Sequence, residues 1–460
     1  MKEHVAPVQL SFLGGAGTVT GSKILLKTKK HQVLVDCGLF QGLKELRLLN
    51  WRKPPLEVGK LDAVILTHGH LDHCGYLPVL VKYGFDGPIY ATEPTRDVTE
   101  IILRDSARIQ EEDAARANQY GYTKHHPAKP LYNEHDVDLT MPYLATVEQE
   151  KWVEVNEDFR FCFRNSGHIL GSSFIELECK DRKIVFSGDI GRRKPLLMHP
   201  PALFTEADYL ILESTYGDRL HSNTSPYEEL KEMVHHAYKK GGVLIIPSFA
   251  VERAQELLLI LNTLRDEQSI PAIPIYLDTP MGIDVTELYL KYHQWHSLSQ
   301  AECKTMMHNV HLIRKFEETL QVLKKHGPKI VIAGSGMVTG GRVLYYLEEL
   351  LDDEKNTVLL VGFQAPGTRG SLLGSGSNDV KIHGKYYTVR AEIKQIASLS
   401  AHGDQADILW WLSHFKTAPK HTYLNHGEPQ ASDELRIKIK DTFGWEVSVA
   451  KMKEDYELQA

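Results

Sequence analysis

The segment Thr67-His68-Gly69-His70-Leu71-Asp72-His73 places three histidines and a carboxylate within six positions. It follows residues 61–66, an apolar run typical of a buried strand, so the cluster is expected on the loop at the carboxyl end of that strand. Alternate residues of an extended loop face opposite sides. His68 and His70 can then face one metal ion while Asp72 and His73 turn toward a second. The segment therefore predicts a paired metal site.

Three later segments offer further ligands at strand ends of the same type. His168 follows the strand-like residues 159–163, and Asp189 closes the apolar run 183–187. His426 follows another short apolar segment, residues 422–425. Alone, each of them is more typical of a satisfied structural residue. Together they complete two sites of four or five ligands with room for water, and the carboxylate of Asp189 suits a bridge between two cations.

The complete set of motifs resembles the metallo-β-lactamase superfamily. The histidine cluster, the preceding Asp36-Cys37-Gly38, His168 and Asp189 correspond to its four motifs. Three further segments are similar to the extra motifs of the β-CASP group of nucleic-acid-processing nucleases: Glu213-Ser214-Thr215-Tyr216-Gly217, Ser400-Ala401-His402-Gly403-Asp404 and His426-Gly427-Glu428. The resemblance runs from about residue 8 to about residue 430, and is greatest to the single-chain bacterial and archaeal ribonucleases of that group.

The resemblance implies a set of ligands for two metal ions. Because most of these ligands are nitrogen atoms, two zinc ions are expected. Asp36 is expected outside this set, where it would orient a ligand histidine through a hydrogen bond. The implied ligands are His68, His70 and His168 for the first ion, Asp72, His73 and His426 for the second, and Asp189 between them.

A leaving alkoxide needs a proton, and His402 is the candidate donor. Glu213 ends the strand-like residues 209–212 and is expected to pair with His402, keep it protonated and fix its tautomer. Together with the metal ligand Asp72, these residues form the predicted catalytic set. The alternative for His402 and Glu213 is a structural ion pair at a domain junction.

Composition limits the class of protein. Hydrophobic residues make up 42% and charged residues 25% of the 460, as in globular proteins, with no apolar run long enough to span a membrane. The start of the chain does not resemble a signal peptide, so a cytoplasmic protein without a membrane partner is expected. Five cysteines without a CxxC pair exclude a thiolate zinc site. A net charge of −7 argues against broad coating of nucleic acid, but not against a nuclease with a local positive field.

Alternating strand and helix signals predict two domains. Strands are expected at residues 242–247 and 329–333, each before a helix, which indicates a parallel sheet with helices on its faces. The fold class is therefore α/β. An inserted β-CASP domain is placed at residues 211–390, because the last ligand lies beyond it. The αββα sandwich is assigned to residues 1–210 and 391–460, which the resemblance implies more firmly than the periodicity does.

The glycine-rich residues 333–342 follow a strand and open a helix, where backbone amides can hold a phosphate. Ser335 and Gly336 are the expected phosphate contacts, with Arg253 as a weaker candidate. Glycines in such a turn can also be present only because they allow unusual backbone conformations. The arginines of this region can instead stabilise the inserted domain.

The sequence thus predicts a two-metal ribonuclease acting on single-stranded RNA, with endonucleolytic cleavage favoured. A 5′-to-3′ exoribonuclease, a (thio)ester or lactam hydrolase of the same fold, and a non-catalytic scaffold are the alternatives. Intact ligands argue against the scaffold, and a small-molecule hydrolase would need neither His402 nor Glu213. The oligomeric state stays open, with a homodimer among the options.

Overall fold

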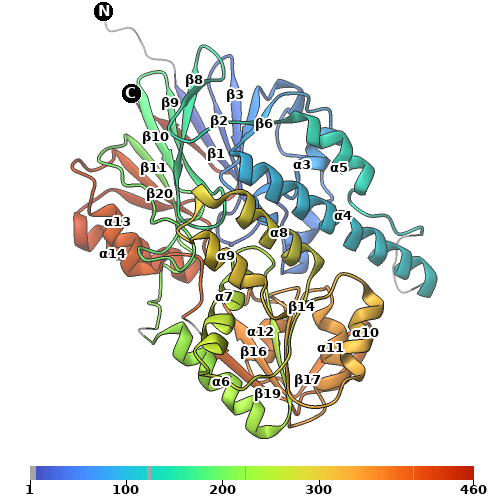
Figure 1. Cartoon of the computed structure of the whole chain (residues 1–460). Helices are drawn as coiled ribbons and strands as arrows, with labels where there is room; N and C mark the ends of the chain where they lie inside the picture. The colour runs from blue at the N-terminus through green and yellow to red at the C-terminus, as the bar shows by residue number, and fades with distance from the viewer. Residues whose placement is uncertain (1–6, 122–125, 223, 397, 460) are drawn as a thin grey trace, which may run out of the picture. The chain divides into compact units, whose positions relative to one another are not determined.

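The computed structural model describes residues 7–121, 126–222, 224–396 and 398–459 (Figure 1). The chain divides into two compact units, Met1–Leu220 with His402–Ala460, and His221–Ala401. It leaves the first unit after Leu220 and returns to it at His402. The domain borders expected from the sequence, 210/211 and 390/391, lie about ten residues before these borders.

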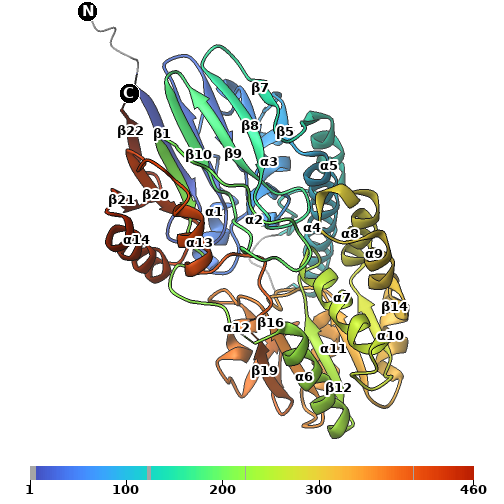
Figure 2. The same ribbon diagram turned by 60° about the vertical axis from the view of Figure 1, so that its left-hand side comes forward.

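Two seven-stranded sheets form the centre of the first unit (Figure 2). In spatial order the first sheet consists of β22 (Asp455–Leu458), β1 (Val8–Gly14), β2 (Lys23–Lys27), β3 (Gln32–Val35), β4 (Ala63–Ile65), β5 (Ile89–Ala91) and β6 (Leu144–Thr146). The second consists of β21 (Val447–Val449), β20 (His421–Asn425), β11 (Tyr209–Glu213), β10 (Arg182–Phe186), β9 (Ser173–Cys179), β8 (Phe159–Asn165) and β7 (Trp152–Glu154).

The main core of this unit lies between the two sheets. Alternate residues of each strand point inward, so Leu10 and Phe12 of β1 join one buried cluster with Phe161 and Phe163 of β8. Burying such large side chains on both inner faces is what holds two sheets together.

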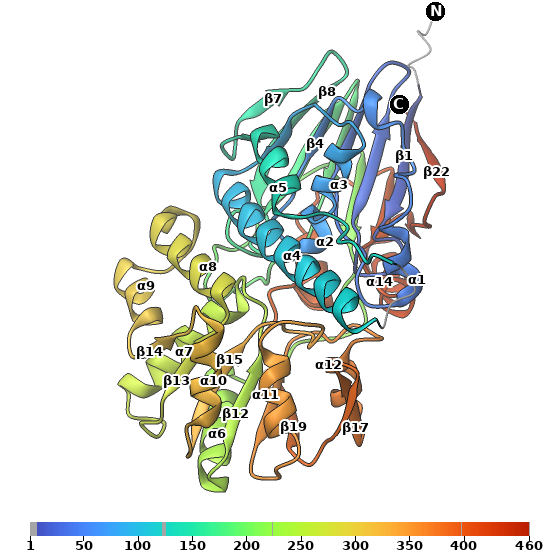
Figure 3. The same ribbon diagram turned by 90° about the vertical axis from the view of Figure 1, so that its right-hand side faces the viewer.

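Helices cover the outer faces of both sheets. The first sheet carries α2 (Leu71–Cys74), α3 (Leu77–Lys82), α4 (Glu93–Tyr120) and α5 (Glu134–Thr140) (Figure 3). The second carries α13 (Gln405–Leu412) and α14 (Pro429–Phe443), whose apolar residues share a buried cluster with β10 and β11. Trp411 of α13 is buried in it and stacks on Phe174. The predicted αββα sandwich is confirmed.

Helix α4 shows how local sequence sets element ends. The Thr92 hydroxyl accepts a hydrogen bond from the Thr95 amide at its start, and Gly121 closes it with a left-handed φ of 64°. The helix has 28 residues but carries charged side chains along its length. In the described part of the chain, no helix combines the length and the apolar character that crossing a membrane requires.

The second unit contains a six-stranded sheet in which every pairing is parallel. Its strands, in spatial order, are β14 (Val310–Leu312), β13 (Ile275–Asp278), β15 (Lys329–Ala333), β12 (Val243–Pro247), β16 (Thr357–Val361) and β19 (Glu392–Ile396). The central strands are buried along their whole length, because helices cover both faces of such a sheet. The predicted parallel-sheet insert is confirmed.

Seven helices and a hairpin complete the described part of this unit. The hairpin pairs β17 (Asp379–Ile382) with β18 (Lys385–Thr388). The helices are α6 (Pro226–Lys240), α7 (Arg253–Asp266), α8 (Pro280–Lys291), α9 (Gln300–Met307), α10 (Phe316–Lys324), α11 (Val343–Leu350) and α12 (Arg369–Gly374). In the first unit, the short α1 (Lys44–Leu49) follows β3.

Candidate metal centre

The histidine cluster spans a loop and a helix. His68 and His70 lie on the loop after β4, whereas Asp72 and His73 belong to the first turn of α2, which begins at Leu71. The prediction that all four residues lie on an extended loop is therefore wrong. A tertiary hydrogen bond anchors this turn, because the Cys37 amide donates to the His73 carbonyl at 2.7 Å. The turn brings Asp72 and His73 next to His426, while the ring centre of His73 stays 4.0 Å from that of His68.

The other predicted ligands follow three strands of the second sheet. Strands β10, β11 and β20 are parallel neighbours, so Asp189, Glu213 and His426 meet at one edge of the sheet. His168 joins them because β8 and β10 both pair antiparallel with β9 and thus run in the same direction. This topology brings residues more than 350 positions apart into one cluster.

His68, His70 and His168 face one another with their ring nitrogens. The Nδ1 atom of His70 lies 3.1 Å from Nε2 of His68 and 3.2 Å from Nε2 of His168. The Asp189 Oδ2 atom lies 3.3 Å from the first of these Nε2 atoms and 3.4 Å from the second. All four ligand atoms fall within one possible metal-binding group.

Asp72, His73 and His426 form a second such group. The Nε2 atom of His426 lies 3.2 Å from Nε2 of His73 and 3.4 Å from Oδ2 of Asp72. The other carboxylate oxygen of Asp189, Oδ1, lies 3.3 Å from Nε2 of His73 and 3.2 Å from Nδ1 of His426. Asp189 thus presents one oxygen to each group.

These distances fit two bound cations. A tetrahedral zinc site with bonds of 2.0–2.1 Å has ligand atoms about 3.3 Å apart. The Asp189 Oδ1 atom is buried without a hydrogen-bond partner among the described residues, which is costly for a carboxylate unless a cation compensates it. Nearby imidazoles and a carboxylate are also the donors that zinc prefers.

Burial sets the protonation state of the first group. It lowers the pKa of His68 to about 3 and that of His70 to about 4, and it holds the pKa of His168 well below its usual value. These imidazoles are therefore neutral near pH 7. Neutral imidazole is the form that binds a metal ion, so the first group is ready to accept one.

Asp36 contacts one of the candidate ligands, His73, and its orienting role stays a prediction. Its carboxylate lies 2.7 Å from Nδ1 of His73 and accepts hydrogen bonds from the amide and hydroxyl of Thr67. The Thr67 hydroxyl also lies 3.0 Å from Nδ1 of His68, and that of Thr215 lies 3.2 Å from Nδ1 of His426. The two threonines were not singled out in the sequence. Their position within the quoted motifs was the only available signal.

His402 lies at the edge of the metal groups and pairs with Glu213. Its Nδ1 atom is 3.2 Å from both carboxylate oxygens of Glu213, and its Nε2 atom is 3.9 Å from Oδ2 of Asp189. Burial lowers the pKa of His402, but the charges of Glu213 and Asp189 outweigh it and raise the pKa to about 9. A cationic His402 with Nε2 directed toward the metal groups can donate a proton there.

The residues predicted to bind phosphate lie in the second unit. The Ser335 hydroxyl accepts hydrogen bonds from the amides of Thr339 and Gly340, so it shapes its own loop. A side chain at Gly336 would clash with the ring of Phe249. Phosphate binding by Ser335, Gly336 and Arg253 stays a prediction.

The arginines near this loop have partners inside the unit. Arg253 is buried and forms an ion pair with Glu256. Arg342, which follows the glycine-rich turn, donates to Asp278 at 2.6 Å. These contacts agree with the alternative that arginines of this region stabilise the insert.

Comparison with known proteins shows the family of this chain. A metallo-beta-lactamase superfamily model matches residues 17–235, a Beta-Casp domain model matches residues 254–373, and a model described as a Zn-dependent metallo-hydrolase RNA specificity domain matches residues 386–450. Ribonuclease TTHA0252 of Thermus thermophilus is 34% identical over 451 residues, which cover 96% of this chain and 98% of that protein. The chain belongs to the β-CASP metallo-β-lactamases.

Other β-CASP relatives cover nearly all of this chain. An RNase J-like protein of Methanocaldococcus jannaschii is 33% identical over 95% of this chain and 96% of its own length. Transcription termination factor FttA of the same organism is 31% identical over 95% of this chain and 69% of its own length. A crystal structure of a protein of unknown function from Enterococcus faecalis shares the fold, with a TM-score of 0.54 and 14% identity over 98% of this chain and 100% of that one. The predicted family is confirmed, and this β-CASP chain is a metal-dependent hydrolase of a ribonuclease group.

Proposed function

We propose that the chain is a two-zinc ribonuclease that cleaves single-stranded RNA internally in the cytoplasm. The observation that carries this proposal is the His402–Glu213 pair beside a complete set of metal ligands. A hydrolase of small activated substrates has no need of a separate proton donor. The match to an RNA specificity domain and the ribonucleases among the relatives support RNA as the substrate.

Two groups of side chains would hold the zinc ions. His68, His70 and His168 serve the first, and Asp72, His73 and His426 serve the second. Asp189 supplies one oxygen to each. Bound zinc ions supply an acidified water and positive charge to stabilise the phosphoryl oxygens. Asp36 holds the ring of His73 in the orientation that the site requires.

His402 would deliver a proton to the leaving oxygen of the ribose. Glu213 accepts the hydrogen on Nδ1, which fixes the ring and directs Nε2 toward the ligand groups. The same carboxylate also accepts the Ile190 amide at 2.6 Å, so its own position is fixed by the backbone. The pair therefore acts as a positioned acid and its orienting partner.

Ser335→Asp tests the proposed phosphate loop of the second unit. A negative charge beside a bound phosphate should raise the KM for RNA by about tenfold, the order of one lost hydrogen bond to a charged group, and leave metal content unchanged. Steady-state kinetics with elemental analysis measures both. Asn309→Asp, which adds the same charge at an exposed site of the same unit, is the control. A KM unchanged from wild type would reject the role of Ser335.

A circular RNA tests the proposed cleavage mode. An endonuclease opens the circle, whereas an exonuclease that needs a free 5′ end leaves it intact and degrades only the linear form. Nitrocefin, incubated in parallel, tests the alternative of a lactam hydrolase. Turnover of nitrocefin without RNA cleavage would overturn the proposal. The oligomeric state stays open, with a homodimer as one option, and light scattering measures it.

A further inference from the structure

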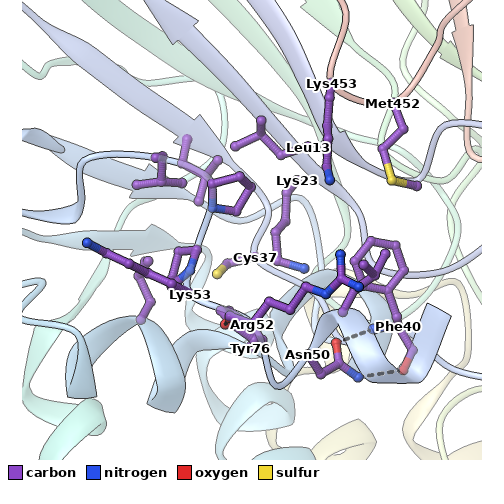
Figure 4. Close-up of a pocket in the computed structure, with 16 residues that line it drawn as sticks. Leu13, Lys23, Cys37, Phe40, Asn50, Arg52, Lys53, Tyr76, Met452 and Lys453 are labelled. Atoms are coloured by element: carbon purple, nitrogen blue, oxygen red, sulfur yellow. Dashed lines mark hydrogen bonds between the residues drawn. The ribbon is translucent and has the colours of Figure 1, made fainter. Parts of the chain in front are cut away.

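A basic pocket lies in the first unit, apart from the metal ligands (Figure 4). Sixteen residues line it, and none carries a carboxylate, although four are cations: Lys23, Arg52, Lys53 and Lys453. Its volume of about 70 Å³ accommodates several water-sized groups, which is enough for a phosphate. Such a local excess of positive charge is notable in a chain with a net charge of −7. The pocket thus combines a mostly apolar lining with four cations and no carboxylate.

Lys23 forms the buried part of this pocket. It is only 5% exposed, and its ammonium donates to the Gly38 carbonyl and lies 4.7 Å from the ring centres of both Phe40 and Tyr76. No carboxylate forms an ion pair with it within the described ranges. Burial lowers the pKa of Lys23 to about 8, so the ammonium remains largely charged at pH 7. The carbonyls of Gly38 and Gly21 and the two rings solvate this charge, but no anion neutralises it among the described residues.

Exposed cations surround the mouth of the pocket. Arg52, Lys53 and Lys453 are exposed and make no ion pair with any residue that the structure describes. Trp51, which precedes Arg52, is 58% exposed. Trp51 does not line the pocket but is the chain neighbour of one of its cations. Proteins bind single-stranded nucleic acid with cations that meet the phosphates and aromatic rings on which bases stack.

The pocket and the metal centre share one backbone segment. Cys37 lines the pocket, while the preceding Asp36 contacts His73 of the metal centre. The Cys37 amide donates to the His73 carbonyl at 2.7 Å, and its carbonyl accepts from the Tyr76 amide at 2.8 Å. The pocket and the metal centre thus lie on either side of one buried segment of the same unit.

We propose that this pocket binds a backbone phosphate of single-stranded RNA away from the cleaved bond, with Trp51 stacking on an adjacent base. The inference rests on the proposed ribonuclease function and adds a second contact for the same substrate. Lys23 supplies the buried charge, and Arg52 and Lys53 attract the phosphate at the mouth. The subsite would favour longer RNA over dinucleotides.

The test compares two double variants with equal loss of charge. Arg52→Ala/Lys53→Ala removes cations at the mouth, and Lys27→Ala/Lys29→Ala removes two exposed cations at the other end of β2. For a 12-nucleotide RNA, the first variant should raise KM about tenfold, while the second should match wild type. The increase should be much smaller for a dinucleotide. Fluorescence anisotropy with uncleaved RNA, in a His402→Ala background, should show a salt dependence reduced by roughly 0.7 per lost phosphate contact.

The outcomes separate this subsite from the function it rests on. Equal KM values for the two double variants would overturn the subsite while RNA cleavage by wild type stands. RNA binding that depends on Arg52 and Lys53 without any cleavage by wild type would instead support the subsite and overturn the ribonuclease. Inorganic phosphate that stabilises wild type but not the Arg52→Ala/Lys53→Ala variant, with RNA binding unaffected, would identify a site for a free anion and reject the RNA assignment.

Discussion

Replacing Asp189 with alanine is expected to remove both metal ions and reduce RNA cleavage by roughly a thousandfold or more. The loss should exceed the ten- to hundredfold effect typical of residues that only orient a ligand. Asp189 presents Oδ2 to His68 and His168 and Oδ1 to His73 and His426, at 3.2–3.4 Å. The carboxylate thus lies between the two ligand groups.

Elemental analysis and cleavage of labelled RNA measure the two effects of Asp189→Ala on the same sample. Asp181→Ala, at the exposed turn between β9 and β10, is the matched control and should keep both metals and full activity. Thermal unfolding shows whether the variant is folded. A folded Asp189→Ala protein that retains two metal ions would show that the carboxylate does not bridge them.

His402→Ala is expected to keep both metal ions and lower kcat on RNA by roughly a hundredfold or more, the usual scale for loss of a general acid. His402 is outside both ligand groups, yet its Nε2 lies 3.9 Å from Asp189. The loss should shrink for bis-p-nitrophenyl phosphate, because its leaving group needs no proton. The difference between the two substrates therefore isolates proton transfer.

His199→Ala, at an exposed histidine of the same unit, is the control for His402 and should retain wild-type kcat. Glu213→Gln should cause a smaller loss than His402→Ala, because the acid remains but loses the charge that raises its pKa. Equal losses on RNA and on the activated ester would mean that His402 positions substrate or structure, and the general-acid role would be withdrawn.

Much of this fold was accessible from sequence because its signals are local. Apolar runs ending in His or Asp predicted both the strands and the edge at which their ligands meet. The short helix α2 was missed because its four residues are too few to show a helical period. Pairing of β1 with β22 joins segments over 440 positions apart, and no local pattern specifies such a contact.

The contacts that support the site were harder to predict from the sequence. Thr67 and Thr215 lie within hydrogen-bond distance of ring nitrogens, and their presence in a motif does not by itself indicate that contact. Lys23 begins an apolar strand, and in the sequence such a lysine is typical of a solvent-exposed charge. Only folding shows that the segment carrying Phe40 and the loop carrying Tyr76 enclose it.

Zinc titration of the metal-free protein, with cleavage of labelled RNA as the readout, tests the central claim most directly. Cleavage should be absent without metal and reach its plateau at two equivalents of zinc per chain, because both ligand groups must be filled. A plateau at one equivalent, or RNA cleavage by the metal-free protein, would contradict the two-metal ribonuclease.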